Sequence, residues 1–183
     1  MAFVVVYDAN VLYPSYQRSL LIEVAQAGLV RARWTEQILD EAFRNLKKNR
    51  PDLSPARLDR TRELMNGAIR DVLVTGYEPL IGALDLPDPD DRHVLAAAIK
   101  VGAQTIVTNN LKDFPADRLA AWDIEASSAD DFLHAMVDLN PKVVFSLVQK
   151  IAISLKKPPM DVDQVLAVLN DEGLVATVAA LRS

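Results

Sequence analysis

The sequence contains no cysteine among its 183 residues. Disulfide scaffolds and thiolate metal sites are therefore excluded, and the absence is compatible with a cytoplasmic chain. No apolar run approaches the roughly 20 residues that a membrane-spanning helix needs. The apolar run at residues 2–7 is too short for a signal peptide, lacks a basic flank and is followed directly by Asp8. We therefore expect a cytoplasmic protein without a membrane partner.

An excess of positive charge is also lacking, because the chain has 20 Lys and Arg residues and 25 Asp and Glu residues, which gives a net charge of −5. Taken alone, this balance argues against a nucleic-acid partner. The charges are unevenly distributed, however, with a basic segment at residues 44–62 and clustered acids at residues 85–91. A basic segment beside an acidic pocket suits a metal-dependent enzyme acting on phosphodiesters, although two solvated helix faces would give the same pattern.

The overall composition is that of a folded chain. Half of the residues are hydrophobic and a quarter are charged, so disorder is not expected. The sequence has no internal repeats and no low-complexity segments. Its length fits one domain with a modest extension. We place the main domain at residues 1–139 and a C-terminal helical extension at residues 140–183, either packed on the domain or used to bind a partner.

The first part of the chain predicts one strand followed by helices. Residues 3–7 are continuously apolar and β-branched, which is typical of a buried parallel strand. Asn10 is the expected cap of a helix that ends at Gly28. Residues 35–72 predict two antiparallel helices that are joined by residues 49–54. Residues 77–81 are a candidate second strand.

The middle of the chain predicts a parallel α/β sheet. Residues 94–99 are apolar almost all round, so their helix should be buried, and Gly102 should end it. A strand is expected at residues 105–108 and a short last strand near Ile124. Strand, helix and strand in this order predict a parallel sheet with right-handed crossovers. Helical patterns at residues 128–138, 141–155, 162–169 and 174–181 follow. Trp34 and Trp122 are expected to be packing anchors.

Acidic and polar residues follow the predicted strands. Asp8 comes directly after the first strand, and Asn110 and Asp113 follow the strand at residues 105–108. Asp88, with Asp90 and Asp91, begins the buried helix. Ligands of open α/β sheets bind at the carboxyl ends of the strands. Clustered carboxylates repel one another unless a cation compensates, and hard oxygen ligands favour Mg²⁺ or Mn²⁺. The pattern therefore predicts metal-assisted phosphodiester hydrolysis.

Four segments resemble, in order, the motifs of one family. Residues 4–12 (VVVYDANVL) are similar to the opening strand of PIN domains, and residues 38–41 (ILDE) to the helix that carries the second acid. Residues 88–98 (DPDDRHVLAAA) and residues 108–114 (TNNLKDF) are similar to the third and fourth motifs. The chain thus resembles a PIN-domain ribonuclease over about residues 3–125. The resemblance implies a PIN-like three-layer α/β/α fold with a central parallel sheet, plus the C-terminal helical extension.

The same resemblance implies a set of site residues and a reaction. Asp8 and Asp91 are expected to ligate Mg²⁺, or Mn²⁺, with Glu41 completing the acidic pocket and Asp88 ranked second to Asp91. The expected reaction is hydrolysis of RNA by metal-activated water, leaving 5′-phosphate and 3′-hydroxyl ends. Structural alternatives stay open. An acid in a helix's first turn favourably meets the helix dipole, as Asp91 would, and a glutamate in the place of Glu41 is more often solvated.

The fourth motif departs from the commonest PIN pattern, because Asn110 stands where many members have an aspartate. Asparagine ligates metals weakly and carries no charge. Asp113 is therefore the candidate that supplies the missing negative charge. Whether the site takes one metal or two is left open. Thr108 or Asn109 is a candidate for orienting the attacking water. An alternative function is that of a degenerate PIN domain that binds RNA or a protein partner without cleavage.

The resemblance also implies partners. A small PIN protein of this kind looks like a VapC-type toxin, with a cognate antitoxin and a homodimeric state. The RNA-binding candidates are Arg44, Lys47, Lys48 and Arg50.

Rival folds fit the sequence less well. A haloacid-dehalogenase phosphatase needs an acid at Asn10, a dinucleotide-binding fold needs a glycine-rich turn after the first strand, and Lys112 is poorly placed for a receiver domain. His93 is assigned no role.

Overall fold

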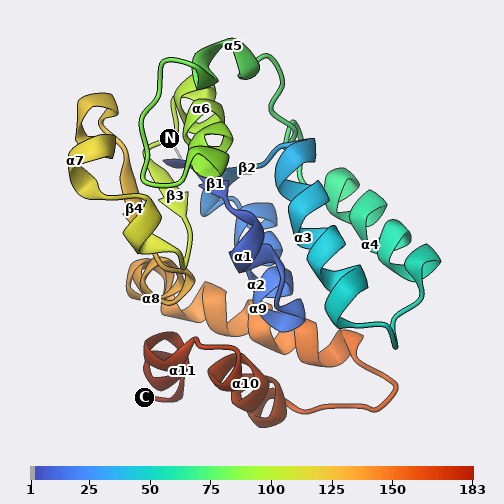
Figure 1. The fold of residues 1–183 in the computed structure, drawn as a ribbon. Helices are drawn as coiled ribbons and strands as arrows, with labels where there is room; N and C mark the ends of the chain where they lie inside the picture. Colours follow the sequence, from blue (N-terminus) through green and yellow to red (C-terminus); the bar gives the residue numbers. More distant parts are fainter. Residues whose placement is uncertain (1–2) are drawn as a thin grey trace.

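The computed structural model describes residues 3–183, and four strands within them form a parallel sheet in the order β2-β1-β3-β4. The strands are β1 (Phe3–Tyr7), β2 (Val30–Arg33), β3 (Thr105–Val107) and β4 (Glu125–Ser127). Val6 of β1 lies beside Arg33 of β2 and Ile106 of β3. The predicted parallel sheet with helices on both faces is confirmed, including a C-terminal helical region (Figure 1). β2 was not predicted from the sequence.

The segment between β1 and β2 forms two helices instead of the single helix that was predicted. They are α1 (Ala9–Leu12) and α2 (Ser15–Gln26), separated by Tyr13 and Pro14. Pro14 has extended backbone angles (φ −69°, ψ 129°), which interrupts the helix. The prediction that Asn10 caps this segment is wrong. Asp8 is the N-cap of α1, and its carboxylate accepts the Ala9 N–H.

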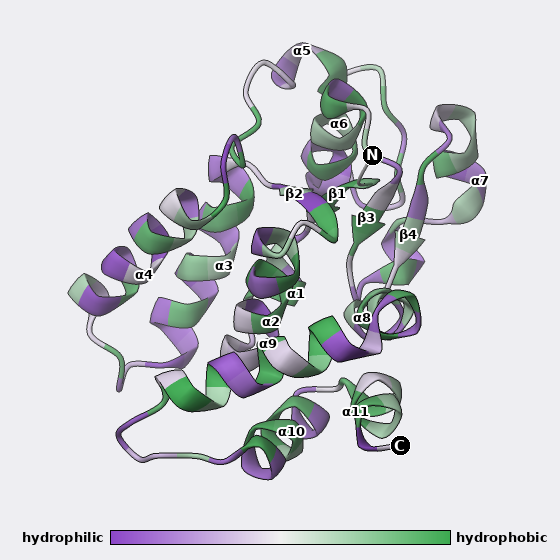
Figure 2. Cartoon of the chain, turned by 180° about the vertical axis from the view of Figure 1, so that it is seen from behind, coloured by the Kyte–Doolittle hydropathy of each residue, from purple (hydrophilic) through white to green (hydrophobic). Residues whose placement is uncertain are grey.

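The next two helices form the predicted antiparallel pair. They are α3 (Glu36–Asn49) and α4 (Pro55–Ala68), and they lie side by side in Figure 1. The side chains of Thr35 and Ser54 cap them by accepting the N–H groups of Ile38 and Arg57. Figure 2 shows that α3 and α4 each carry hydrophilic and hydrophobic residues along their length.

The candidate strand at residues 77–81 is wrong, because α5 (Glu78–Ile81) occupies this segment. Pro79 explains the difference, since proline is tolerated in the first turn of a helix and lacks the N–H that a strand donates. The 3-10 turn η1 (Pro89–Asp91) leads into α6 (Arg92–Val101), which is buried as predicted. Gly102 ends α6 in the left-handed conformation (φ 65°).

The chain between β3 and β4 contains η2 (Leu111–Asp113), α7 (Ala116–Leu119) and η3 (Ala120–Trp122). The last strand begins one residue after Ile124. Trp34 is fully buried and donates its indole N–H to the Asn66 side chain at 2.9 Å, as a packing anchor does. The same prediction for Trp122 is wrong, because this side chain is 45% exposed beside the turn at Asp123.

Four helices complete the chain: α8 (Ala129–Leu139), α9 (Pro141–Ser154), α10 (Val162–Asp171) and α11 (Val175–Arg182). α6 covers β1 and β3 on one face of the sheet, whereas α2 packs on β2 and α9 lies beyond α2 (Figure 1). Val144, Leu166 and Val178 of the last three helices belong to the same hydrophobic core as the strands. The division after residue 139 stays a prediction. No helix within residues 3–183 is both long and apolar enough to cross a membrane.

Candidate active site

Asp8 lies at the carboxyl end of β1 and is buried, with 3% of its surface exposed. Its Oδ1 accepts the Ala9 N–H at 2.7 Å, and its Oδ2 accepts the Thr108 hydroxyl at 3.0 Å and the Asn10 amide at 3.2 Å. Burial raises the pKa of Asp8, and these three donors act in the opposite direction. The carboxylate is therefore fixed in orientation at a point where its charge is poorly solvated.

Thr108 and Asn10 join the ends of β1 and β3. The Thr108 hydroxyl accepts the Asn10 Nδ2 at 3.0 Å and the Asn110 N–H at 3.1 Å, in addition to its bond to Asp8. The Asn10 Oδ1 accepts the Asn109 N–H at 2.8 Å, and the Asn109 Oδ1 accepts the N–H of Ala129 at the start of α8. These hydrogen bonds hold the two strand ends at a fixed separation and orient Asp8.

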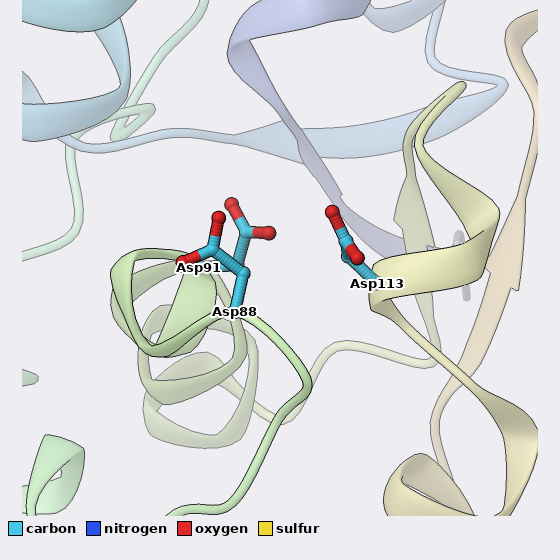
Figure 3. Close-up of side chains that lie close together, drawn as sticks. All are labelled: Asp88, Asp91 and Asp113. Carbon is cyan, nitrogen blue, oxygen red and sulfur yellow. The ribbon is translucent and has the colours of Figure 1, made fainter.

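Three further acids gather beside α6. Asp88, Asp91 and Asp113 each place one carboxylate oxygen so that the three atoms lie within 4.8 Å of one another. Figure 3 shows Asp88 and Asp91 together at the start of α6, with Asp113 facing them from η2. The Asn110 Nδ2 donates to the Asp113 Oδ2 at 2.6 Å. The structure thus brings together acids from two loops that are separated by α6 and β3 in the sequence.

Asp91 is at the electrostatic centre of the constellation. Burial raises the pKa of Asp91 to about 7, together with the negative charges of Asp8, Asp88, Asp113 and Glu41. Its Oδ2 is buried and has no hydrogen-bond partner within residues 3–183. A buried carboxylate oxygen without a donor is costly, and its neighbours add repulsion instead of compensation. A cation in contact with this atom would relieve both costs.

Glu41 reaches the same cavity from α3. Burial raises its pKa, as does the negative charge of Asp8, while Arg44 lowers it. The cavity has a volume of about 440 Å³ and lies between the strand ends and α3. Its polar lining consists of Asp8, Asn10, Tyr13, Glu41, Asn45, Asn49, Asp91 and Asn110. Glu41, Asp8, Asp91 and Asn110, which the sequence proposed as site residues, therefore share one cavity.

Three residues that line this cavity were not predicted from the sequence, namely Tyr13, Asn45 and Asn49. Asn45 and Asn49 follow Glu41 by four and eight residues, so they share its helix face. That spacing was the signal that could have found them once Glu41 was chosen. Tyr13 carried no such signal, because its position depends on the break between α1 and α2.

The donor set fits a hard divalent cation. The candidate ligands of the acidic cluster are carboxylate oxygens, and Asn110 lines the cavity that Asp91 also lines. Hard oxygen ligands of this kind select Mg²⁺, Mn²⁺ or Ca²⁺ over softer metals. The unpartnered Asp91 Oδ2 is the specific atom that a cation would satisfy. His93, next to the cluster, is buried, and this burial lowers its pKa.

The four basic candidates differ in their surroundings. Lys47 is paired with Asp59 at 2.7 Å, and Arg50 is paired with Asp52 at 2.7 Å. Arg44 and Lys48 are exposed on α3 and form no ion pair with any of the described residues. Arg44 lies one turn after Glu41 and acts on its pKa, which places a free guanidinium at the rim of the acidic cavity.

Comparisons with known proteins assign most of the chain. A family model described as PIN domain matches residues 4–112, and a model described as VapC50 C-terminal domain matches residues 129–183. A Mycobacterium tuberculosis protein named "Putative ribonuclease VapC50" is 37% identical over 97 residues. This match covers 53% of the chain and 57% of the relative, so it spans little more than half the length of that protein. No solved structure matches the chain.

Proposed function

The chain belongs to the PIN-domain family, and on that premise we propose that it is a Mg²⁺-dependent endoribonuclease that hydrolyses RNA phosphodiester bonds. One observation supports the proposal above all others. Among residues 3–183, the buried Asp91 Oδ2 has no hydrogen-bond partner, and four other carboxylates act on the charge of Asp91. Such an arrangement is unfavourable without a cation, and active sites are where unfavourable electrostatics of this kind are retained. Mn²⁺ has the same ligand preference and is expected to substitute.

We assign the metal to Asp91, Asp88 and Asp113, with Asp8 and Glu41 across the same cavity and Asn110 beside them. When bound, the cation lowers the pKa of an attacking water and neutralises charge that develops on the phosphoryl oxygens.

The protein's own residues position the reaction. Thr108 and Asn10 hold the Asp8 carboxylate in one orientation, and orientation of this kind is worth a large part of a catalytic barrier. Asn110 holds Asp113. We assign Glu41 the role of proton acceptor from the attacking water, because its raised pKa favours uptake of a proton. The expected products carry 5′-phosphate and 3′-hydroxyl ends.

The substrate and partners are further parts of the proposal. The name of the Mycobacterium tuberculosis relative supports RNA as the substrate class. Arg44 and Lys48, which are exposed and unpaired within the described chain, are the first candidates to contact the RNA backbone, with Lys47 and Arg50 available if their ion pairs open. We further propose that the chain is the toxin half of a toxin–antitoxin pair, with an antitoxin protein as its partner and a homodimeric state.

Cleavage of RNA by the wild type and by Asp8→Asn tests the enzymatic part of the proposal. The assay uses structured and unstructured RNA with Mg²⁺, Mn²⁺ or EDTA. Asp138→Asn is the matched control, because Asp138 is exposed on α8, away from the cavity. We expect metal-dependent cutting by the wild type and the control, and none by Asp8→Asn. Absence of RNA cleavage by a folded wild type with metal present would favour the alternative, a degenerate PIN domain that binds RNA or a protein partner without cleaving RNA. The uncharged Asn110, in the place of the usual aspartate, is the feature that supports this alternative.

A further inference from the structure

A second cavity adjoins the catalytic one. It has a volume of about 500 Å³ and lies between the α1–α2 junction, the tip of the α3–α4 pair and the end of α10. Tyr13 lines both cavities, and Asn49 of the first is followed in the chain by Arg50 of the second. The two cavities are therefore neighbours, with Tyr13 forming part of the wall of each.

The lining of this second cavity has the character of a nucleobase site. Tyr13 and Tyr16 provide aromatic rings, and Leu53 and Leu58 provide apolar surface. Arg50 provides a guanidinium that is paired with Asp52 at 2.7 Å and that a phosphate would have to share or take over. Arg50 and Tyr13 are close enough to influence each other electrostatically. Aromatic side chains stack on bases without regard to sequence, and a neighbouring guanidinium attracts the phosphate that the base carries. Apolar walls alone would favour any hydrophobic ligand, but the added cation favours a nucleotide.

The interior of the cavity excludes a phosphate. The Glu172 carboxylate lies there and accepts the N–H groups of Tyr16 at 3.3 Å and Gln17 at 2.7 Å, at the N-terminus of α2. The helix end that would otherwise attract an anion is thus already occupied by one. Arg18 is committed as well, because its guanidinium donates to the carbonyl oxygens of Leu12 and Tyr13. A bound nucleotide would therefore place its base inside and its phosphate at Arg50.

The C-terminal helices shape this cavity. Glu172, just after α10, fixes the first turn of α2, which carries Tyr16. The hydroxyl of Tyr16 donates to the sulfur of Met160, at 3.0 Å, in the segment before α10. The second cavity thus depends on the part of the chain that lies outside the PIN-domain match.

We propose that this second cavity is a nucleotide subsite, which binds the base of an RNA residue flanking the phosphate that is cleaved. The proposal rests on the proposed function, because it presupposes an RNA strand in the catalytic cavity. It gives the C-terminal helices a direct part in substrate selection, since they set the shape of the pocket that receives the base. The subsite is expected to make RNA affinity depend on residues that do not touch the acidic cluster.

Two variants test the subsite. Ser15→Phe fills the cavity from the exposed first position of α2, and Ser15→Leu fills it with a smaller apolar side chain. Ser146→Phe and Ser146→Leu, on the exposed face of α9, are the matched controls. Affinity is measured by the fluorescence anisotropy of a labelled eight-nucleotide RNA with Ca²⁺ replacing Mg²⁺. Hydrolysis of bis(4-nitrophenyl) phosphate with Mn²⁺ reports on the catalytic cavity alone.

We expect both variants to weaken RNA binding, Ser15→Phe by about tenfold, which is the range of one lost stacking contact. Both should hydrolyse the small diester at the wild-type rate, and the controls should match the wild type in both assays. Wild-type RNA affinity in both variants would overturn the subsite, as would a parallel loss of diester hydrolysis. If Ser15→Phe fails to fold, Ser15→Leu decides alone. If the wild type hydrolyses neither substrate but its RNA affinity still depends on Ser15, the catalytic proposal fails while the subsite stands.

Discussion

The buried and half-buried carboxylates of this protein differ in how many hydrogen-bond donors offset the cost of burying their negative charge. Asp8 is buried but has three donors, whereas the Asp91 Oδ2 has none within residues 3–183. Asp130, in the first turn of α8, has its pKa lowered because the N–H groups of Ala176 and Thr177 and the Thr177 hydroxyl donate to it. Asp130 therefore serves the structure, while the charge of Asp91 is left to be balanced by a proton or by a bound cation.

Thr108 is predicted to act on the reaction through Asp8. Thr108→Val keeps the shape of the side chain but removes the donor to the Asp8 Oδ2. We expect RNA cleavage to fall by about 10- to 100-fold, the usual effect of losing a group that orients a metal ligand. The free energy of unfolding should fall by about 1–3 kcal/mol. Thr108→Ser should restore both quantities, and cleavage by Thr108→Val at the wild-type rate would show that Thr108 does not position Asp8.

Much of the candidate site was predicted from single residues because the order of acids and strands constrains it. Asp8, Asp91 and Asp113 were proposed from their positions at strand ends and at a helix start, and the structure places them around one region. Tyr13 and Asn45 were not proposed, because lining a cavity depends on how α1 and α3 are oriented. Periodicity predicts which face of a helix is buried, but it does not predict which polar face borders a site.

At the level of elements, short segments explain where predictions from the sequence failed. β2 is only four residues long, and two of them are arginines, so its pattern gave no apolar run. α5 was taken for a strand, although Pro79 fits the start of a helix. The long helices α3, α6 and α9 were predicted well, because their periodicity extends over several turns and caps mark their ends.

The contact between α10 and α2 gives a prediction at this level. Glu172→Ala removes the acceptor of two N–H groups at the N-terminus of α2. We expect the free energy of unfolding, measured in urea, to fall by about 1–2 kcal/mol, as for the loss of a helix cap. Asp171→Ala is the control, because Asp171 is the exposed neighbour on α10. Equal stabilities of the two variants would show that Glu172 does not tie the C-terminal helices to α2.

Across the whole molecule, the net charge of −5 is the sum of acidic and basic residues that are unevenly distributed. Asp91 is under the influence of four other acids at the sheet edge, while α3 carries exposed cations at its far end. Burying this many carboxylates together lowers the stability of the metal-free protein. A bound cation reverses that effect, so metal binding and folding stability are coupled.

This coupling predicts the pH dependence of stability. The pKa of Asp91 rises from an ordinary value of 3.8 to about 7 in the folded protein, so the folded state holds a proton that the unfolded state releases. Stability in EDTA should therefore fall as the pH rises towards 7 and then level off. The raised pKa values of Asp8 and Glu41 act in the same direction. Melting temperatures between pH 5.5 and 8 provide the measurement.

The metal should reverse this trend. Protons and cations compete for the same carboxylates, so Mg²⁺ or Mn²⁺ should raise the melting temperature more at pH 8 than at pH 5.5. Asp91→Asn removes both the titration and the ligand. Its melting temperature in EDTA should depend less on pH than that of the wild type. A wild-type melting temperature that rises between pH 5.5 and 7 in EDTA would contradict this account of the acidic cluster.

The central claim is that the carboxylate cluster around Asp91 holds the cation that cuts RNA. The most direct test measures the rate of RNA cleavage against Mg²⁺ concentration for Asp91→Asn and for Asp90→Asn. Asp90 is the exposed chain neighbour and lies outside the group of three clustered carboxylates. We predict that Asp90→Asn follows the wild-type curve, while Asp91→Asn loses cleavage or needs at least about tenfold more Mg²⁺. Indistinguishable curves for the two variants would contradict the claim.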